Sequence, residues 1–131
     1  MANSKEHREK VDRNRAFLNT LIGRPDFPEW KAVCAFYTAV HLVERLRASF
    51  NEHSQNHDER WQFFKIHKKP FGAIYASYHA LYDASILARY YTKNRFDRAF
   101  PDAKVESILI GEHLHAITEF VNHFYASNSS P

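Results

Sequence analysis

The sequence predicts an all-α protein, arranged as an up-and-down bundle of four to five helices. Only 3 glycines and 5 prolines occur among its 131 residues, too few for the many tight turns of an all-β fold. Apolar residues recur at helical spacing, and no segment has a convincing strand pattern. Apolar residues make up 44% of the chain, enough for one core. We therefore expect a single domain over residues 1–131, with residues 1–3 and 127–131 frayed.

Two helices are expected in the first part of the chain. The first spans about residues 4–22, with Ser4 as its N-cap and Gly23 as its stop signal. The second spans about residues 28–50, with Pro28 in its first turn. Because this second helix is apolar on two sides, we expect it to be central in the bundle.

The rest of the chain is expected to contain a short helix, two long helices and one loop. In order, these are a helix from His57 that ends before Pro70 and is capped by Asn56, a helix that Pro70 opens and that runs to about Tyr91, a loop from Asn94 to Pro101, and a helix from about Ala103 to Ala126 capped by Asp102.

Charge, cysteine content and hydropathy limit the class of protein. The formal charge is +3 at pH 7, which permits contact with phosphates without demanding it. Cys34 is the only cysteine, so no internal disulfide can form and a reducing, cytoplasmic location is expected. No apolar run approaches the roughly 18 residues of a membrane span, and the N-terminus lacks the apolar region of a signal peptide. We expect no membrane contact.

Three short patterns lie between residues 30 and 91, roughly half the chain. They are FYxAxHLV at Phe36–Val43, His-x-x-Arg at His57 and Arg60, and YxxLYxxSxxARY at Tyr78–Tyr90. This stretch resembles a group of small bacterial proteins in the HEPN superfamily. The resemblance implies an up-and-down helical bundle, often a homodimer.

The resemblance also implies a set of functions. Some members of the superfamily are metal-independent ribonucleases in toxin–antitoxin, phage-defence or RNA-processing systems. Others are non-catalytic partners of nucleotidyltransferases, or modules that bind nucleotides. RNA or a nucleotide is therefore one expected ligand, and a nucleotidyltransferase or an antitoxin is one expected partner protein.

The first candidate site combines His57 with Arg60. Arg60 could bind a phosphate, and His57 could act as an acid or a base, so we assign both as candidate catalytic residues. The alternative is an ordinary helix start, in which Asn56 caps the helix and Asp58 and Glu59 lie near the positive end of its dipole.

A second candidate site lies on the helix expected after Pro70. Tyr82, Ser85, Arg89 and Tyr90 place a phenol, a hydroxyl and a guanidinium within two helical turns. Together with His41 they form our candidate ligand-binding set, able to hold a phosphate or ribose and to stack bases. The alternative is that the tyrosines bury their rings and that the arginine pairs with an acid.

The ribonucleases of the superfamily use an arginine, usually followed by a polar residue, and a histidine after four to six intervening positions. Arg60 with His67 and Arg47 with His53 fit this spacing. Neither arginine is followed by a polar residue, and two matches are about what chance placement gives for this composition.

Metal binding has weaker support in the sequence. A metal site would form if His41 with Glu44 met His79 with Asp83 on a neighbouring helix, although a lone histidine in an apolar helix is more often part of the core. The last helix places four polar side chains on one face, which we interpret as a solvated or dimer-facing stripe: Glu112, His115, Glu119 and His123. We assign no metal ligand and expect no cofactor.

Three hypotheses about function follow. The first is an RNA- or nucleotide-associated binding or regulatory module, of the kind found in toxin–antitoxin or phage-defence systems. The second is an enzyme, a metal-independent endoribonuclease whose Arg/His site lies at a dimer interface. The third is a structural or protein-interaction module. The sequence leaves open whether the protein is an enzyme.

Overall fold

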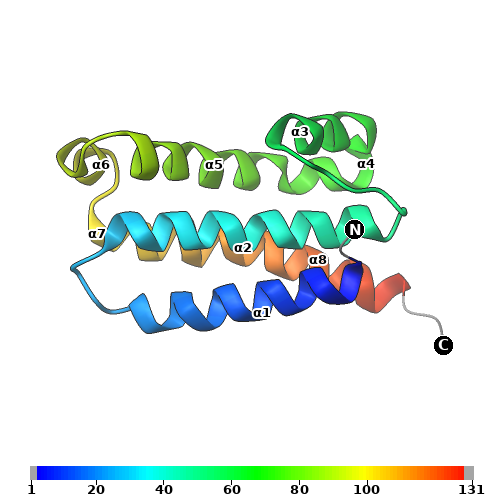
Figure 1. The fold of residues 1–131 in the computed structure, drawn as a ribbon, viewed down its shortest axis with the longest axis horizontal. Helices are drawn as coiled ribbons and strands as arrows, with labels where there is room; N and C mark the ends of the chain where they lie inside the picture. Colours follow the sequence, from blue (N-terminus) through cyan, green and yellow to red (C-terminus); the bar gives the residue numbers. More distant parts are fainter. Residues whose placement is uncertain (1–2, 129–131) are drawn as a thin grey trace.

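The structure, a computed structural model, describes residues 3–128, and its regular secondary structure in that range is entirely helical (Figure 1). The all-α prediction is therefore confirmed. The elements are α1 (Ser4–Leu21), α2 (Pro28–Ala48), α3 (His57–Ile66), α4 (Lys68–Phe71), the 3₁₀ turn η1 (Gly72–Ile74), α5 (Tyr75–Tyr90), α6 (Lys93–Ala99), α7 (Asp102–Lys104), the π-helical segment η2 (Val105–Leu114) and α8 (His115–Asn128).

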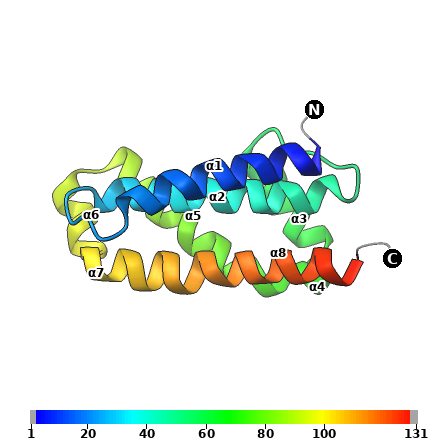
Figure 2. The same cartoon turned by 90° about the horizontal axis from the view of Figure 1, so that it is seen from below.

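Four long helical segments follow one another in alternating directions: α1, α2, α5 and the continuous run from α7 through η2 to α8 (Figures 1 and 2). Helices α3 and α4 lie at one end, near the start of α1 and the end of α8, and α6 lies at the other. Helix α2 packs against α1, α5, η2 and α8, which confirms its predicted central position. No helix among residues 3–128 is long and apolar enough to cross a bilayer.

The first helix begins one residue earlier than its predicted cap implies. Asn3 is the N-cap, because its Oδ1 accepts a hydrogen bond from the Glu6 backbone and the Glu6 carboxylate accepts one from the Asn3 backbone. The prediction of Ser4 as cap was wrong, and its hydroxyl instead lies 3.0 Å from the Tyr125 hydroxyl on α8. Gly23 follows the helix at φ +84°, as its role as a stop signal requires.

Of the ends that the sequence predicts to be frayed, residues 1–2 and 129–131 lie outside the described residues. Within the described part, Asn3 is the N-cap of α1 and α8 continues to Asn128.

The third helix begins at His57 and ends before Pro70, as predicted. Asn56 caps α3 as predicted, its side chain accepting from the Glu59 backbone at 3.0 Å. The helix ends at Ile66, and α4 and η1 intervene before α5 begins at Tyr75, so Pro70 does not open the long helix. The buried underside of α3 consists of Phe63 and Phe64.

Two predictions about residues 94–102 were also wrong. The expected loop at residues 94–101 is mostly helix α6, capped by Thr92 and held to the core by buried Phe96. Asp102 does not cap the last helix, whose N-cap is Pro101. The last helix is continuous from α7 to α8 in Figure 2. Its hydrogen bonding is π-helical over η2.

The Asp102 carboxylate binds the side chain of Lys31 on α2 instead of capping a helix. Lys31 is fully buried, and its Nζ donates to Asp102 at 2.9 Å and to Glu106 at 2.7 Å. Burial alone would lower the pKa of Lys31, but the hydrogen bonds to Glu106 and Asp102 outweigh it and raise that pKa. This ion triad fastens the start of α2 to the start of the last helix.

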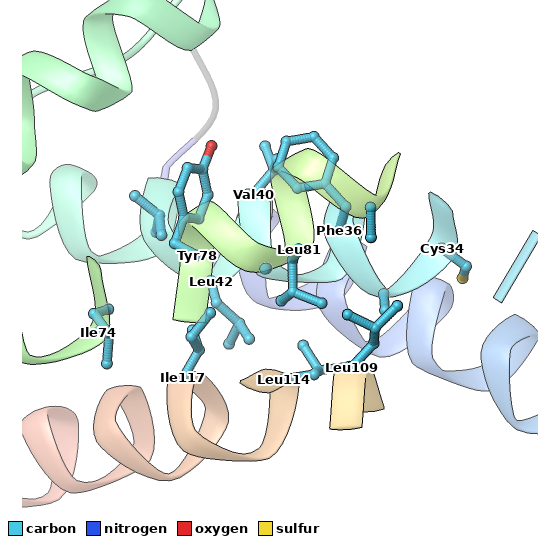
Figure 3. Close-up of a cluster of buried hydrophobic side chains, with 14 of the residues drawn as sticks. Cys34, Phe36, Val40, Leu42, Ile74, Tyr78, Leu81, Leu109, Leu114 and Ile117 are labelled. Carbon is cyan, nitrogen blue, oxygen red and sulfur yellow. The ribbon is translucent and has the colours of Figure 1, made fainter. Parts of the chain in front are cut away.

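The core lies where α2, α5 and the last helix meet (Figure 3). Leu81 of α5 packs there with Leu109, Leu114 and Ile117 of the last helix, and each buried side chain of this size contributes about 1.5–3 kcal/mol. Tyr78 is completely buried, yet in Figure 3 its hydroxyl points away from those three residues of the last helix. The Tyr78 hydroxyl therefore faces the side of the core on which α3 lies over α2 and α5.

Candidate functional site

Five side chains from three helices meet around the Tyr78 hydroxyl, and we call them the Arg60 cluster: Glu44 of α2, His57 and Arg60 of α3, and Tyr78 and Tyr82 of α5. Arg60 Nε donates to the Tyr78 hydroxyl at 2.9 Å, and Arg60 Nη1 donates to Glu44 Oε1 at 3.2 Å. His57 Nδ1 lies 3.5 Å from the same hydroxyl. The predicted pair of His57 and Arg60 therefore meets at one buried phenol.

His57 lies between aromatic rings. Its imidazole stacks on Tyr82 with ring centroids 3.7 Å apart, and Trp61 meets it edge-on at 4.5 Å. Burial, with the charge of Arg60, lowers the pKa of His57 to about 4, and Arg89 adds to the effect. His57 is therefore neutral at pH 7.

The Tyr78 hydroxyl lies within reach of both Arg60 and His57 Nδ1. Burial raises the pKa of Tyr78 to about 12, so the phenol keeps its proton at pH 7. Since its oxygen accepts from Arg60, its own proton is free to be donated to His57 Nδ1. The His57 proton then lies on Nε2, an atom that is buried and has no partner among the described residues.

The charge of Arg60 is already neutralised inside the protein. Glu44 is buried and Arg60 is largely covered, with side chains 4% and 14% exposed, and the other oxygen of Glu44 accepts from the Ser54 backbone at 3.1 Å. Arg60 thus holds α3 onto α2, a structural role that the sequence did not indicate. Phosphate binding by Arg60 stays a prediction, and it would have to compete with Glu44.

A second group, the Arg89 cluster, consists of Tyr37 on α2 with Ser85, Arg89 and Tyr90 on α5. Arg89 Nη1 donates to the Tyr37 hydroxyl at 3.0 Å, and its Nε and Nη2 donate to the Ser85 carbonyl and hydroxyl at 3.3 and 3.4 Å. Its guanidinium carbon lies 5.2 Å from the centroid of the Tyr90 ring, which is 71% exposed. Within residues 3–128 no carboxylate lies at ion-pair distance from Arg89, so the arginine–acid pair left open by the sequence is not formed there.

Surface hollows adjoin the Arg89 cluster, and sequence reasoning missed some of the residues that line them, Glu29 and Trp30 among them. One, of about 200 Å³, is lined by Arg89 and Ala88 of α5 and by Glu29, Trp30 and Val33 of α2. Trp30 is 54% exposed, and Glu29 Oε2 is buried without a partner in the described part of the chain. The sequence did contain a pattern that could have identified Trp30, because Trp30 and Tyr37 fall on the same side of the helix. The same pattern is equally typical of a buried helix face.

His41 lies beyond this hollow and does not join the Arg89 cluster. It lines a neighbouring hollow of about 340 Å³ together with Trp30 and Tyr37. Its Nδ1 is 3.1 Å from Nδ1 of His7 on α1. Burial, with the nearby His7, lowers the pKa of His41 to about 4. The candidate ligand-binding residues thus divide among three places: Tyr82 in the Arg60 cluster, His41 beside α1, and the other three around Arg89.

The two clusters are nevertheless continuous along α5. Ser85 Oγ donates to the Tyr82 carbonyl at 2.8 Å, so the residue that positions Arg89 is bonded to the residue that stacks on His57. The buried Phe36 ring packs near the rings of His57, Tyr78 and Tyr82, with ring centroids 6.4, 5.7 and 5.7 Å away. The two clusters are therefore adjacent along α5.

The other arginine–histidine pairs serve the packing of α3. His67 Nε2 lies 3.1 Å from Glu52 Oε2, and the His67 ring stacks on Phe50. Arg47 donates to the Glu59 carbonyl at 2.7 Å and to Glu52 at 3.1 Å. No contact described between residues 3 and 128 joins either arginine to the histidine at the matching spacing.

The metal arrangements considered from the sequence do not form among the described residues. His79 and Asp83 pair with each other on the exposed side of α5, with 3.3 Å between Nδ1 and Oδ2, away from His41 and Glu44. The four polar residues of the last helix are exposed, as expected for a solvated stripe: Glu112, His115, Glu119 and His123.

Comparison of the chain with known protein families, with curated proteins and with solved structures found no match.

Proposed function

We propose that this protein is a HEPN-like module that binds RNA or a nucleotide through the Arg89 cluster. The observation that carries the proposal is a half-exposed guanidinium without a carboxylate partner in the described part of the chain, flanked by the rings of Tyr37 and Tyr90. A cation beside exposed aromatic rings can bind a phosphate while a base stacks next to it.

Each part of a nucleotide has a matching group beside Arg89. The guanidinium has five N–H donors and uses three of them on Tyr37 and Ser85, so two remain for phosphate oxygens. The exposed Trp30 ring offers a stacking surface in the adjoining hollow. Glu29 Oε2, which has no partner in the part of the chain that the structure describes, can accept a hydrogen bond from a ribose hydroxyl or a base amino group.

The remaining parts of the proposal follow from the resemblance of residues 30–91 to the HEPN superfamily. The alternating directions of α1, α2, α5 and α8 are what an up-and-down bundle requires. A homodimer, and a partner such as a nucleotidyltransferase or an antitoxin, belong to the same proposal. So does a role in a toxin–antitoxin or phage-defence system.

Binding of a fluorescein-labelled single-stranded RNA of 12 nucleotides, followed by fluorescence anisotropy at several salt concentrations, tests the proposal. Arg89→Ala should weaken binding at least about tenfold and reduce the salt dependence by about one phosphate contact. Trp30→Ala should weaken binding through loss of stacking, with little change in the salt dependence. AMP and ATP as competitors distinguish recognition of a nucleotide from recognition of a strand.

Arg13→Ala is the matched control, because it removes one positive charge from an exposed position on α1. Equal losses in Arg13→Ala and Arg89→Ala would mean nonspecific charge attraction and would contradict the proposed site. A folded protein that binds neither RNA nor nucleotide would contradict the proposal as a whole and favour a protein-interaction role.

A metal-independent ribonuclease is the second candidate. It is favoured by one observation, that His57 and Arg60 meet at the Tyr78 hydroxyl with His57 neutral at pH 7. In such an enzyme His57 would transfer the proton and Arg60 would stabilise phosphate charge. The ion pair with Glu44 makes Arg60 a weaker phosphate ligand, which is why binding at Arg89 ranks first.

RNA cleavage in the presence of EDTA tests the second candidate. Cleavage by the wild type that His57→Ala abolishes, and that the exposed-site variant Arg13→Ala retains, would establish the enzyme hypothesis. Wild-type protein that binds RNA without cleaving it would leave the binding module as the function.

A further inference from the structure

A group of potential metal ligands lies at the end of the bundle where α1 begins. His7 of α1, Glu44 of α2 and His53 of the loop between α2 and α3 each offer one ligand atom, and these three atoms lie within 4.8 Å of one another. Two imidazoles and one carboxylate are a donor set that suits Zn²⁺ and other divalent first-row transition ions. The three residues are 37 and 9 positions apart in sequence, so only the fold brings them together.

His7 supplies an independent indication that a ligand belongs there. Its side chain is only 6% exposed, and its Nε2 is buried with no hydrogen-bond partner among the described residues. The other nitrogen is occupied, because His7 Nδ1 lies 3.1 Å from His41 Nδ1. A buried imidazole nitrogen without a partner is destabilising, so the site is incomplete as it stands.

The pair of His7 and His41 limits the arrangements of protons. One of the two Nδ1 atoms must donate and the other accept. If His7 donates, its Nε2 carries a bare lone pair, which is the form that binds a metal. His41 then orients the ligand from outside the coordination sphere, as partners of metal-bound histidines do.

The carboxylate is also oriented by its neighbours. Glu44 Oε1 accepts from Arg60 at 3.2 Å and Oε2 accepts from the Ser54 backbone at 3.1 Å, which fixes the carboxylate plane. Metal-bound carboxylates commonly keep such outer hydrogen bonds. Because Arg60 offsets part of the negative charge, the site favours an ion held mainly by imidazole nitrogen over Ca²⁺ or Mg²⁺, which prefer several oxygen ligands.

We propose that His7, Glu44 and His53 bind a divalent transition-metal ion of the Zn²⁺ type. Ligand atoms about 2.0–2.1 Å from a tetrahedral ion lie about 3.4 Å apart, so the side chains must draw together slightly as the ion binds. His53 lies on the loop between helices, where such an adjustment is easiest. Three protein ligands leave one position for water, and the ion would link the start of α1 to the loop that precedes α3.

Calorimetric titration of EDTA-treated, tag-free protein with Zn²⁺ tests the proposal. One ion should bind per chain, and Co²⁺ should give the visible absorption of a tetrahedral nitrogen–oxygen site. His53→Ala should weaken Zn²⁺ binding at least about tenfold. Zn²⁺ should raise the thermal unfolding midpoint of the wild type and have much less effect on the variant.

His79→Ala is the matched control, because it removes an exposed histidine that lies beside a carboxylate on α5. It should bind Zn²⁺ as the wild type does. The proposal is overturned if the wild type fails to bind Zn²⁺, if His53→Ala binds it with unchanged affinity, or if binding is lost in His79→Ala. This site stands independently of RNA binding at Arg89, since the two experiments use different ligands and different variants.

Discussion

Arg60 and Glu44 form a buried ion pair between α3 and α2, with 3.2 Å between Nη1 and Oε1. The pair lies where three features of the molecule meet: the Tyr78 phenol, the stacked His57 ring and the proposed metal ligands. Glu44 belongs both to the Arg60 cluster and to the proposed metal ligands. Its hydrogen-bond partners therefore determine how both groups are held.

Arg60→Ala is expected to destabilise the protein strongly. Removal of one partner leaves Glu44 buried and uncompensated, which typically costs about 3–5 kcal/mol. Urea unfolding at pH 7 measures the loss. Arg60→Lys is the matched control, because it keeps the charge while giving up the planar fork that contacts both Glu44 and Tyr78, and it should cost less. Equal stability of Arg60→Ala and the wild type would show that the pair contributes nothing.

Protein stability should fall as the pH is lowered from about 6.5 towards 4. In the folded protein the pKa values of His41 and His57 are lowered to about 4, whereas in the unfolded chain both side chains take up protons near pH 6.5. The unfolded state therefore binds more protons throughout this window, and the free energy of unfolding decreases with falling pH. Above pH 6.5 neither histidine contributes to the slope.

Two measurements check this pH dependence. Denaturant unfolding between pH 7 and 4.5 should give a shallower slope for His57→Gln than for the wild type, by up to one proton. NMR titration of the folded protein should show both imidazoles still neutral at pH 5.5. A titration midpoint near 6.5 for His57 would contradict its description as a desolvated ring between Tyr82 and Trp61.

Lys31→Met is expected to destabilise the protein by about 2 kcal/mol or more. The substitution keeps the apolar stem but leaves two partly exposed carboxylates, Asp102 and Glu106, without the cation that joins them. Thermal and urea unfolding measure the effect. Lys93→Met is the matched control, because Lys93 forms an exposed ion pair with Asp97 on α6, and pairs of that kind contribute little. Similar losses in both variants would mean that burial of the Lys31 triad is unimportant.

Helix positions could largely be read from the sequence, and their exact ends could not. The stop at Gly23 and the cap at Asn56 depend on chemistry within three or four residues, which a sequence shows directly. Helix α6 was missed because its short segment of aromatic and basic residues resembles a loop until the burial of Phe96 is known. The cap at Asn3 was missed because the adjacent Ser4 is an equally good cap by composition.

The candidate residues were predictable as types, and their roles were not. The spacing of His57 and Arg60 correctly placed the two side chains one turn apart on a capped helix. It could not show that Glu44, sixteen residues before Arg60, takes up the guanidinium. Likewise, the lack of an acidic partner for Arg89 within residues 3–128 depends on which side chains of α2 face α5.

The sequence by itself determined that the chain forms helices, roughly where they lie, and that the second helix is central. These properties depend on periodicity and on local hydrogen bonds, which act over a few residues. Only the tertiary structure decided that Arg60 is neutralised by Glu44 and that Arg89 has no carboxylate partner among the described residues. It also decided that His7, Glu44 and His53 converge. Such pairings join side chains from different elements, and ion pairs, hydrogen bonds and metal coordination require separations of a few ångströms that only packing sets.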